Sequence, residues 1–364
     1  MERLLTILPP SAEATDIRLS PKDALITAAG FEDRALAAIR SLPSSSFGNL
    51  VVLTYSTGDK RNHPKAFISE ARAKALPNKN ITFVDYDRFE PHAFHPALRK
   101  CLETIKVSKV ILDISAMSKL AILLCLDVCR RLKLTVSVYY AEALDYGPSE
   151  QGYLKAREEK AIHRPSMQIY SGVQAVLRVS PFSSVAMQGQ PTAAIAFMSF
   201  NDELIQALLN CVSPARLFLI NGKPPLHQWR ERATAWIHEQ LIREWPEADN
   251  PVLDGLPIRA TSTLNYKQTV ATLCELYWQL NVHHRVVLAP TGSKMQSVAC
   301  FLVVAMHPDI QIEYPTPQGF LDLYSKGVGR KWLVEFGNLQ DLVDRMIHTE
   351  RNRHLGFSAI SRPG

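Results

Sequence analysis

The sequence is short of the residue patterns that mark the commonest metal and nucleotide sites. Among 364 residues there are six cysteines, and no two of them form a Cys-x-x-Cys pair. Zinc ribbons and disulfide frameworks are therefore disfavoured, and we expect reduced thiols packed in the core of a cytoplasmic protein. Neither Gly-x-Gly-x-x-Gly nor Gly-x-x-x-x-Gly-Lys-[Ser/Thr] occurs. Dinucleotide-dependent dehydrogenases and Walker-type NTPases need these glycines to bind the phosphates of their nucleotides. Because the sequence lacks both motifs, it does not support either class.

Long apolar runs and blocks of one charge are missing as well. No run approaches eighteen uncharged apolar residues, and the first residues include the acidic Glu2 and no small-residue cleavage pattern. We therefore expect no targeting to a membrane. Lys and Arg number 41 against 35 Asp and Glu, which leaves a net charge of +6. Because this mild excess is spread along the chain, small anionic ligands fit it better than duplex DNA.

Strand patterns alternate with helical patterns, and this alternation restarts in the middle of the chain. The predicted strands cover residues 24–28, 50–55, 81–86, 110–114 and 135–140, and then 193–198, 217–220, 258–260, 286–289 and 310–314. The sequence thus predicts an α/β protein with two tandem Rossmann-like domains, each a mainly parallel sheet flanked by helices.

The length agrees with two domains of about 150 residues each. We place the first Rossmann-like domain at residues 20–146 and the second at 191–330. Residues 147–190, richer in Gly, Pro, Ser and charge, are interpreted as a connector, and residues 331–364 as a C-terminal helical tail. Within the second domain, residues 227–245 are predicted to form one long amphipathic helix.

Two polar turns stand at equivalent places, each after a predicted fourth strand and before an apolar helix. The first is Ser115-Ala116-Met117-Ser118-Lys119, and the second is Thr291-Gly292-Ser293-Lys294. A turn that opens a helix aims backbone N–H groups and the helix dipole at one point, and a lysine adds a full positive charge there. The pair favours anion binding, although a serine that merely caps each helix is the alternative.

The turns after the first predicted strands also correspond. Gly30-Phe31-Glu32-Asp33-Arg34 matches Ser199-Phe200-Asn201-Asp202-Glu203, and 89 residues separate Gly30 from Lys119 where 95 separate Ser199 from Lys294. This agreement indicates a tandem duplication. In open parallel sheets the loops after strands one and four flank the ligand. Gly30 would allow a ligand to approach the backbone, Glu32 or Asp33 would bind ribose hydroxyls, and Arg34 would bind a phosphate. The alternative is that the acidic residues only stabilise the first turn of the helix. Residues 56–63 would close over the site, or form a solvated loop.

Other clusters are weaker. Residues 85–95 contain carboxylates and two histidines, and His283 and His284 are adjacent, but neither spacing defines a metal geometry. Cys125 and Cys129 stand four apart on an apolar helix, as core residues do. We therefore expect no metal site and no cofactor.

On these four turns the chain resembles the CARF superfamily of CRISPR-associated Rossmann-fold sensors, over most of residues 20–325, and the tandem pair is similar to the SAVED arrangement of fused CARF-like units. In that family a Thr-Gly-Gly-Thr-Lys-like turn and the turns after strand one of two domains form a cleft for cyclic oligonucleotides. The resemblance implies that Ser118, Lys119, Ser293 and Lys294 hold phosphates and that Gly30, Phe31, Ser199 and Asn201 line the cleft. The first turn departs from the family pattern by having Met117 in place of glycine.

The resemblance implies a nucleotide second-messenger sensor of a prokaryotic antiviral defence system that signals to a separate effector protein, since no nuclease pattern or spanning helix is evident in the sequence. A homo-oligomer is compatible with this scheme. Two alternatives stay open. One is a metal-independent phosphodiesterase of the ring-nuclease kind, which uses ribose 2′-hydroxyl attack with Lys119, Lys294 or Arg34 stabilising the developing charge. The other is a scaffold subunit of a defence complex.

Overall fold

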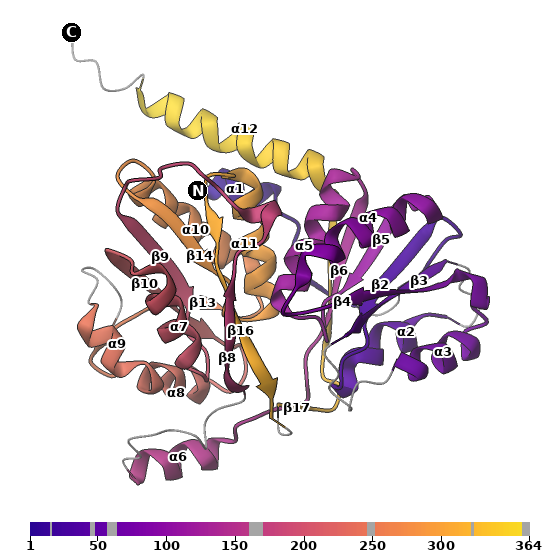
Figure 1. Cartoon of the computed structure of the whole chain (residues 1–364), viewed down its shortest axis with the longest axis horizontal. Coiled ribbons are helices and arrows are strands. Elements are labelled where there is room, and N and C mark those ends of the chain that lie inside the picture. The colour runs from indigo at the N-terminus through magenta and orange to yellow at the C-terminus, as the bar shows by residue number, and fades with distance from the viewer. Residues whose placement is uncertain are drawn as a thin grey trace.

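The computed structural model describes residues 1–14, 17–43, 48–56, 64–159, 170–245, 252–321 and 324–358. Two α/β halves, built on separate sheets, lie side by side, and helix α12 (Leu339–Ser358) runs across the top of the second half to the edge of the first (Figure 1). Most of the loop expected to close over the site, residues 57–63, falls outside the described residues.

The first half is built on a seven-stranded sheet with a parallel centre. Five parallel strands run in the order β4 (Ile81–Tyr86), β3 (Asn49–Tyr55), β2 (Asp23–Ala28), β5 (Lys109–Asp113) and β6 (Thr135–Ala141). Two antiparallel strands extend it beyond β6, first β18 (Lys331–Asn338) and then β1 (Ala12–Glu13). The central strand β2 is buried on both faces, as an apolar run in a covered parallel sheet must be.

The second half repeats the parallel order with five strands. They are β13 (Arg259–Ser262), β10 (Arg216–Lys223), β9 (Thr192–Phe197), β14 (Arg285–Ala289) and β15 (Gln311–Ile312). In chain order both halves therefore read third, second, first, fourth, fifth strand across the sheet. The predicted α/β class and its mainly parallel sheets are confirmed.

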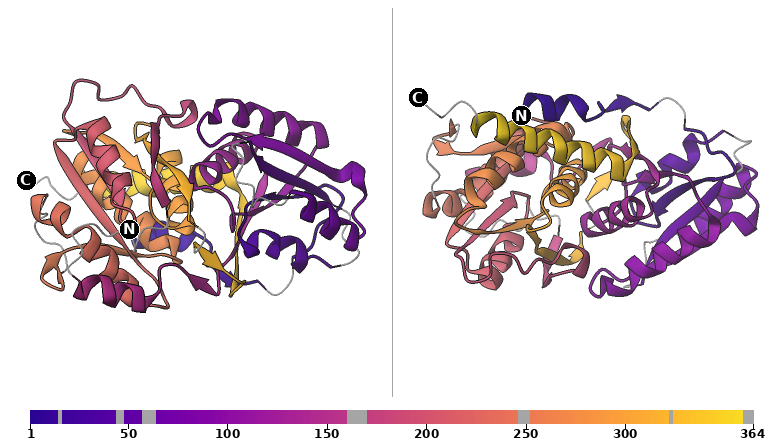
Figure 2. Two further views of the ribbon diagram at one scale, coloured as in Figure 1. Left: turned by 60° about the horizontal axis from the view of Figure 1, so that its bottom comes forward. Right: turned by 90° about the horizontal axis from the view of Figure 1, so that it is seen from above.

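Helices cover both faces of each sheet (Figure 1, Figure 2). In the first half α2 (Ala37–Ser41) and α3 (Pro64–Ala73) pack on one face, and α4 (Phe94–Ile105) and α5 (Lys119–Arg131) on the other. The second half has α7 (Glu203–Val212), α8 (Trp229–Ile237) and α9 (Glu239–Glu244) on one face, and α10 (Tyr266–Leu280) and α11 (Lys294–Met306) on the other. Helix α1 (Glu2–Ile7) packs against α12.

One hydrophobic core is continuous through both halves, because α5 packs directly against α11. Almost every residue of these two helices is buried, including Cys125, Cys129 and Cys300. A helix that is apolar on all sides can be stable only when neighbours surround it, and each of these lies between a sheet and the opposite half. The prediction that Cys125 and Cys129 are core residues is confirmed.

Three predicted elements differ from the structure. The helix expected over residues 227–245 breaks at His238, whose backbone leaves helical geometry between α8 and α9. The imidazole Nε2 of His238 lies 2.9 Å from the Ser199 carbonyl oxygen, so the break seats this ring on the turn after β9. Part of the expected connector is regular, with α6 (Glu150–Glu158) and strand β8 (Tyr170–Leu177), which pairs with β16 (Tyr314–Phe320).

The third difference concerns the expected helical tail. Its first eight residues form β18, which pairs with β6 of the first sheet, and only then does α12 begin. The chain therefore returns from the second half to complete the sheet of the first. Among the described residues, none of the helices combines the length and the apolar character that crossing a membrane requires.

The return of the chain predicts that residues 331–358 are indispensable for folding. Their buried apolar side chains are Val334, Phe336, Leu339, Leu342, Val343 and Met346. At about 1.5–3 kcal/mol for each buried side chain, their loss amounts to about 9–18 kcal/mol, which is as large as the roughly 5–15 kcal/mol that stabilises a typical protein. A chain that ends at residue 330 should show no cooperative thermal unfolding by circular dichroism, whereas one that ends at 358 should unfold like the full chain. A folded 1–330 chain would contradict this.

Candidate functional site

The two Ser-Lys turns occupy the same place in their sheets, at the carboxyl ends of β5 and β14. In each sheet the fourth strand is hydrogen-bonded to the first, β5 to β2 and β14 to β9, so the strand order reverses there. This reversal point is where open α/β sheets bind ligands, because the loops that leave the two strands diverge.

In the first half, buried hydrogen bonds fix the turn after β5. Asp113 accepts hydrogen bonds from the Ser115 backbone N–H at 2.9 Å and the Thr27 hydroxyl at 3.1 Å. Burial raises the pKa of the Asp113 carboxyl to about 6, against the hydrogen bonds from Ser115 that lower it. The Ser115 hydroxyl oxygen accepts the Ala141 backbone N–H at 2.8 Å. Ser115, predicted to contact ligand, is thus a fully buried anchor between β5 and β6.

In the second half, Thr291 anchors the corresponding turn. Its hydroxyl donates to the Phe197 carbonyl at 2.6 Å and accepts the Phe197 backbone N–H at 3.0 Å. Gly292 follows where no side chain fits, since a Cβ there would lie 2.3 Å from Gln296 Oε1 and 2.9 Å from the Phe197 Cβ. The turn therefore depends on glycine for a close approach to β9.

The serines of both turns cap their helices. Ser118 Oγ accepts the Ala121 N–H at 3.2 Å, and Ser293 forms a full capping box with Gln296. Each hydroxyl also donates within the protein, to the Tyr86 hydroxyl and the Thr263 carbonyl respectively. The capping interpretation of these serines is therefore correct in this structure, where their hydroxyl protons are directed at protein groups.

Both turns nevertheless open on one cavity of about 170 Å3. Its wall contains nine of the twelve predicted site residues, namely Gly30, Phe31, Arg34, Ser118, Lys119, Thr291, Gly292, Ser293 and Lys294. The lining also includes aromatic and proline side chains that the sequence analysis did not select: Tyr55, Tyr140, Tyr146, Tyr314, Pro315, Pro317, Phe320 and Tyr324.

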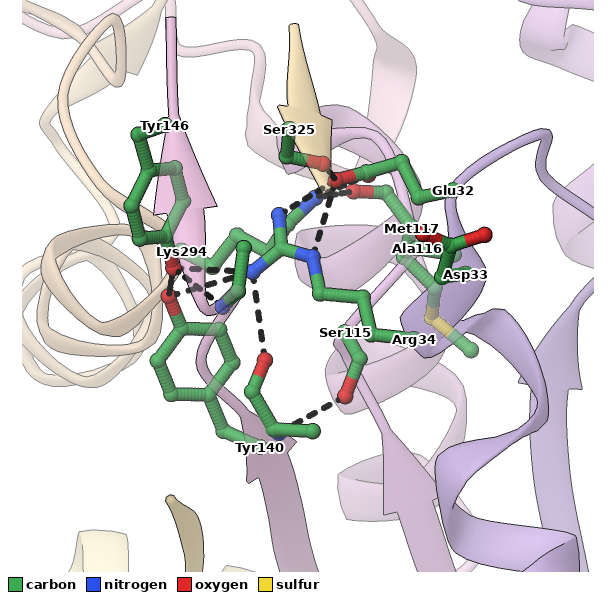
Figure 3. A network of polar contacts seen from close by, with 12 residues as sticks. Glu32, Asp33, Arg34, Ser115, Ala116, Met117, Tyr140, Tyr146, Lys294 and Ser325 are labelled. Carbon is green, nitrogen blue, oxygen red and sulfur yellow. Dashed lines mark hydrogen bonds and ion pairs between the residues drawn. The ribbon is translucent and has the colours of Figure 1, made fainter. Parts of the chain in front are cut away.

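An ion pair between Arg34 and Glu32 forms part of this wall (Figure 3). The guanidinium Nη2 lies 2.7 Å from Glu32 Oε2, and Nε donates to the same oxygen at 2.8 Å. Nη1 faces the Ala141 carbonyl oxygen and the Tyr146 hydroxyl, both at 3.1 Å. The Arg34 side chain is only 2% exposed. Its N–H groups point at protein acceptors, and its contact with a phosphate stays a prediction.

Glu32 and Asp33 likewise bind protein groups. Glu32 accepts a hydrogen bond from the Ser325 hydroxyl at 2.5 Å, and Asp33 accepts the Gly327 N–H at 2.8 Å. Ser325 belongs to β17 (Ser325–Lys326), which pairs with β7 (Asp145–Tyr146). The turn after β2 thus fastens the segment that leads back to β18.

Lys294 joins the two halves. It begins α11 of the second half, and its Nζ donates to the Met117 carbonyl of the first half at 2.6 Å and lies 3.9 Å from Glu32 Oε1 (Figure 3). Lys119 lines the same cavity, close enough for its charge to lower the pKa of Lys294. The two predicted lysines thus face one space.

Burial controls the charges of these groups. Desolvation lowers the pKa of Lys294 to about 7, although Glu32 opposes this, and lowers the pKa of Lys119 to about 8. For Glu32 burial alone would raise the pKa, but Arg34 and Lys294 hold it below the ordinary value. The carboxylate therefore stays ionised, whereas the lysines are close to losing their protons at neutral pH.

A second cavity, of about 410 Å3, adjoins the first. The two share the residues Tyr140, Tyr146, Thr291, Gly292, Ser293 and Tyr324. Ser199 lines this second cavity, so the turn after β9 does not meet the other three turns in one space. Asn201 lines neither cavity: it is fully buried, and its Oδ1 accepts the Glu203 N–H to start α7.

Most of the aromatic and proline residues that line the first cavity and were not predicted from the sequence are tyrosines. Tyr55 illustrates why, because its hydroxyl donates to the Ala116 carbonyl and accepts the Ser118 N–H, both at 3.0 Å. It therefore occupies the first helix N-terminus from a strand sixty residues earlier in the chain. Asp113 did carry a signal, as an acidic residue at the end of an apolar strand beside the Ser115 turn.

Fold and site together define an α/β protein with two Rossmann-like halves and a buried, polar-and-aromatic cavity where their fourth strands end. No protein-family model matches the sequence, and no curated protein matches it. Among solved structures, the precorrin-6A reductase CobK is 10% identical, with a TM-score of 0.23 over 82% of this chain and 90% of that chain. The cytoplasmic domain of a prokaryotic cation chloride cotransporter is 9% identical, with a TM-score of 0.22 over 83% and 96%. Likeness this remote carries no functional argument.

The lowered pKa of Lys294 predicts a pH-dependent stability. Between about pH 7 and the ordinary lysine pKa of about 10.4, the unfolded chain holds a proton at this position that the folded chain has lost. Lys294 should therefore make the free energy of unfolding rise with pH from about 7, by up to about 1.4 kcal/mol per pH unit, and Lys119, with its pKa of about 8, should add a similar rise above about pH 8.

Urea unfolding at a series of pH values measures this slope. Lys294→Met keeps the aliphatic stem and should flatten the slope between about pH 7 and 8, where Lys119 contributes little, while Lys100→Met, at an exposed position on α4, should retain it. An unchanged slope in Lys294→Met would show that the buried amine is not its source.

Proposed function

We propose that the protein is a sensor that binds a phosphate-bearing nucleotide, in the first place a cyclic oligonucleotide, between its two halves and signals to a separate effector protein. The observation that carries the proposal is the meeting of two equivalent Ser-Lys helix starts, one from each half, on one cavity. Two helix dipoles and two lysines directed into one enclosed space favour an anionic occupant.

The pKa values of the lysines fit this occupant. In the absence of an anion, burial destabilises the protonated form of each lysine relative to the neutral form, which is why both pKa values are low. A phosphate in the cavity would stabilise the protonated lysines and recover that cost. Ligand binding should then be accompanied by proton uptake near neutral pH.

The rest of the lining suits a nucleobase. Phe31, Phe320 and Tyr324 form a cluster with ring centroids 5.5–6.3 Å apart, in tilted and edge-on arrangements. Aromatic side chains stack on bases, with about 1–3 kcal/mol for each base. A cavity lined by both lysines and aromatic rings matches the two chemical parts of a nucleotide.

Lys294 supplies a route from binding to signalling. Its bond to the Met117 carbonyl ties α11 of the second half to the first half, and the cavity of about 170 Å3 is smaller than the roughly 300 Å3 at which small-molecule sites begin. A nucleotide would have to extend into the adjoining cavity or part the halves, and it would compete for Lys294 with Met117 and Glu32. Binding therefore favours an altered angle between the halves, which an effector can recognise.

A role in prokaryotic antiviral defence rests on the resemblance to CARF and SAVED sensors carried by the four turns. One observation favours a second candidate function, the ring-nuclease type of phosphodiesterase. Lysines with pKa values of about 7 and 8 are suited to proton transfer at neutral pH as well as to charge stabilisation. Such an enzyme would cleave the ligand that the sensor only binds.

Calorimetry against a panel of cyclic di-, tri-, tetra- and hexanucleotides tests the proposal. We expect saturable binding by the wild type and a loss of about 1.5–3 kcal/mol for each of Lys119→Met and Lys294→Met, because each removes a charged phosphate contact. Lys100→Met, exposed on α4, should bind like the wild type.

Absence of binding across the panel, or wild-type affinity in the double Lys119→Met, Lys294→Met variant, would refute the sensor proposal. Chromatography of the bound ligand after long incubation separates the two candidates. An intact ligand excludes the phosphodiesterase, and a linear product with a 2′,3′-cyclic phosphate establishes it.

A further inference from the structure

A second polar cluster lies far from the cavity, where helix α12 meets the second half. Cys274 of α10, His307 at the end of α11 and Glu350 of α12 are all buried. One donor atom from each, a thiol sulfur, an imidazole nitrogen and a carboxylate oxygen, lies within 4.8 Å of the others. We propose that these residues bind a Zn2+ ion, which fastens α12 to α10 and α11.

The donor set matches the chemistry of zinc, which takes sulfur, nitrogen and oxygen ligands at about 2.0–2.3 Å in a tetrahedral shell. That shell places ligand atoms roughly 3.3–3.8 Å apart, so the three donors need to move by about 1 Å or less. A thiolate and a carboxylate also neutralise the two charges of the ion, which a buried site requires. Three protein ligands leave one position for water.

The histidine supplies an independent indication. Within the described part of the chain, His307 Nε2 is buried and makes no hydrogen bond. Glu350 Oε2 is only 3.0 Å away, but it lies off the direction in which this nitrogen would donate. A buried imidazole nitrogen close to a carboxylate but not aligned with it is the arrangement of two ligands that point at a common ion.

Surrounding residues hold the ligands in place as outer partners of a metal site do. The Trp278 indole N–H donates to Glu350 Oε1 at 2.7 Å, which leaves Oε2 facing the histidine. The Tyr277 ring stacks on the His307 imidazole with centroids 3.7 Å apart and fixes its plane. Trp278 is 36% exposed, so the cluster lies just beneath the surface and an ion can reach it.

The position of the site suggests its purpose. α12 follows β18, which completes the sheet of the first half, and it packs on α11 of the second half and on α5 of the first (Figure 1, Figure 2). An ion held by α10, α11 and α12 would therefore fix the end of the segment that joins the two halves. This role is structural and does not depend on the ligand proposed for the cavity.

The experiment measures metal in the purified full-length chain by mass spectrometry and then titrates the chelator-stripped protein with Zn2+ and Co2+. We expect one Zn2+ per chain, a higher Tm with zinc, and a thiolate-to-cobalt charge-transfer band. Cys274→Ser should lose the band, and Glu350→Gln should bind zinc more than tenfold more weakly. Trp278→Phe, which removes the outer hydrogen bond and keeps an aromatic ring beside His307, should weaken binding by about 10–100-fold.

Cys211→Ser, at an exposed cysteine of α7, controls for adventitious thiol binding and should behave like the wild type. Cys300→Ala, at a buried cysteine of α11, controls for core destabilisation and should keep the band. If the stripped wild type shows neither a charge-transfer band nor a zinc-dependent Tm, or if Cys274→Ser binds as tightly as the wild type, the cluster is a His307–Glu350 ion pair and the proposal is wrong.

Discussion

The junction of the two halves depends on one buried carboxylate. Glu32 lies within 4 Å of Arg34 and Lys294 and accepts a hydrogen bond from Ser325, and these groups come from three separate parts of the chain. An ionised carboxylate without partners would be prohibitively costly in so enclosed a place, and a buried arginine would be equally so. Because each group needs the others, the turn after β2, the start of α11 and the returning segment at β17 must assemble together.

This constraint explains why most polar groups of the candidate site are already hydrogen-bonded to other groups of the protein. Tyrosine hydroxyls, backbone carbonyls and Glu32 take up the donors and acceptors that an open phosphate site would present to its ligand. A ligand that enters would have to replace those contacts. The free energy needed to break them would reduce the net free energy of binding. If the cavity binds the proposed ligand, the same exchange would couple binding to the angle between the halves, as the proposed sensor requires.

The two halves share one strand order, but their first turns line different cavities. Each has the same strand order and a Ser-capped helix after its fourth strand, but only the first half contributes its strand-one turn to the smaller cavity. In the second half the corresponding turn starts α7 through Asn201 and contacts His238, and it faces the larger cavity through Ser199. Equivalent turns in the sequence thus line different cavities in the folded protein.

Sequence periodicity determined the elements, because whether a segment forms a strand or a helix depends on residues close together in the chain. The strand of residues 81–86 was predicted with the bounds that the structure has, and the Ser-Lys turns at both fourth strands were found from their local pattern. Nine of the twelve predicted site residues line one cavity for the same reason, since parallel strands bring equivalent turns to one edge.

Only the tertiary structure decided what each side chain contacts. Arg34 contacts Glu32, Tyr146 and a carbonyl oxygen, because burial obliges a charge to find a partner within the protein. The pairing of β18 with β6, and the meeting of Cys274, His307 and Glu350, join residues that are far apart in the chain. No spacing rule in the sequence encodes such contacts, since they exist only once the two halves have packed.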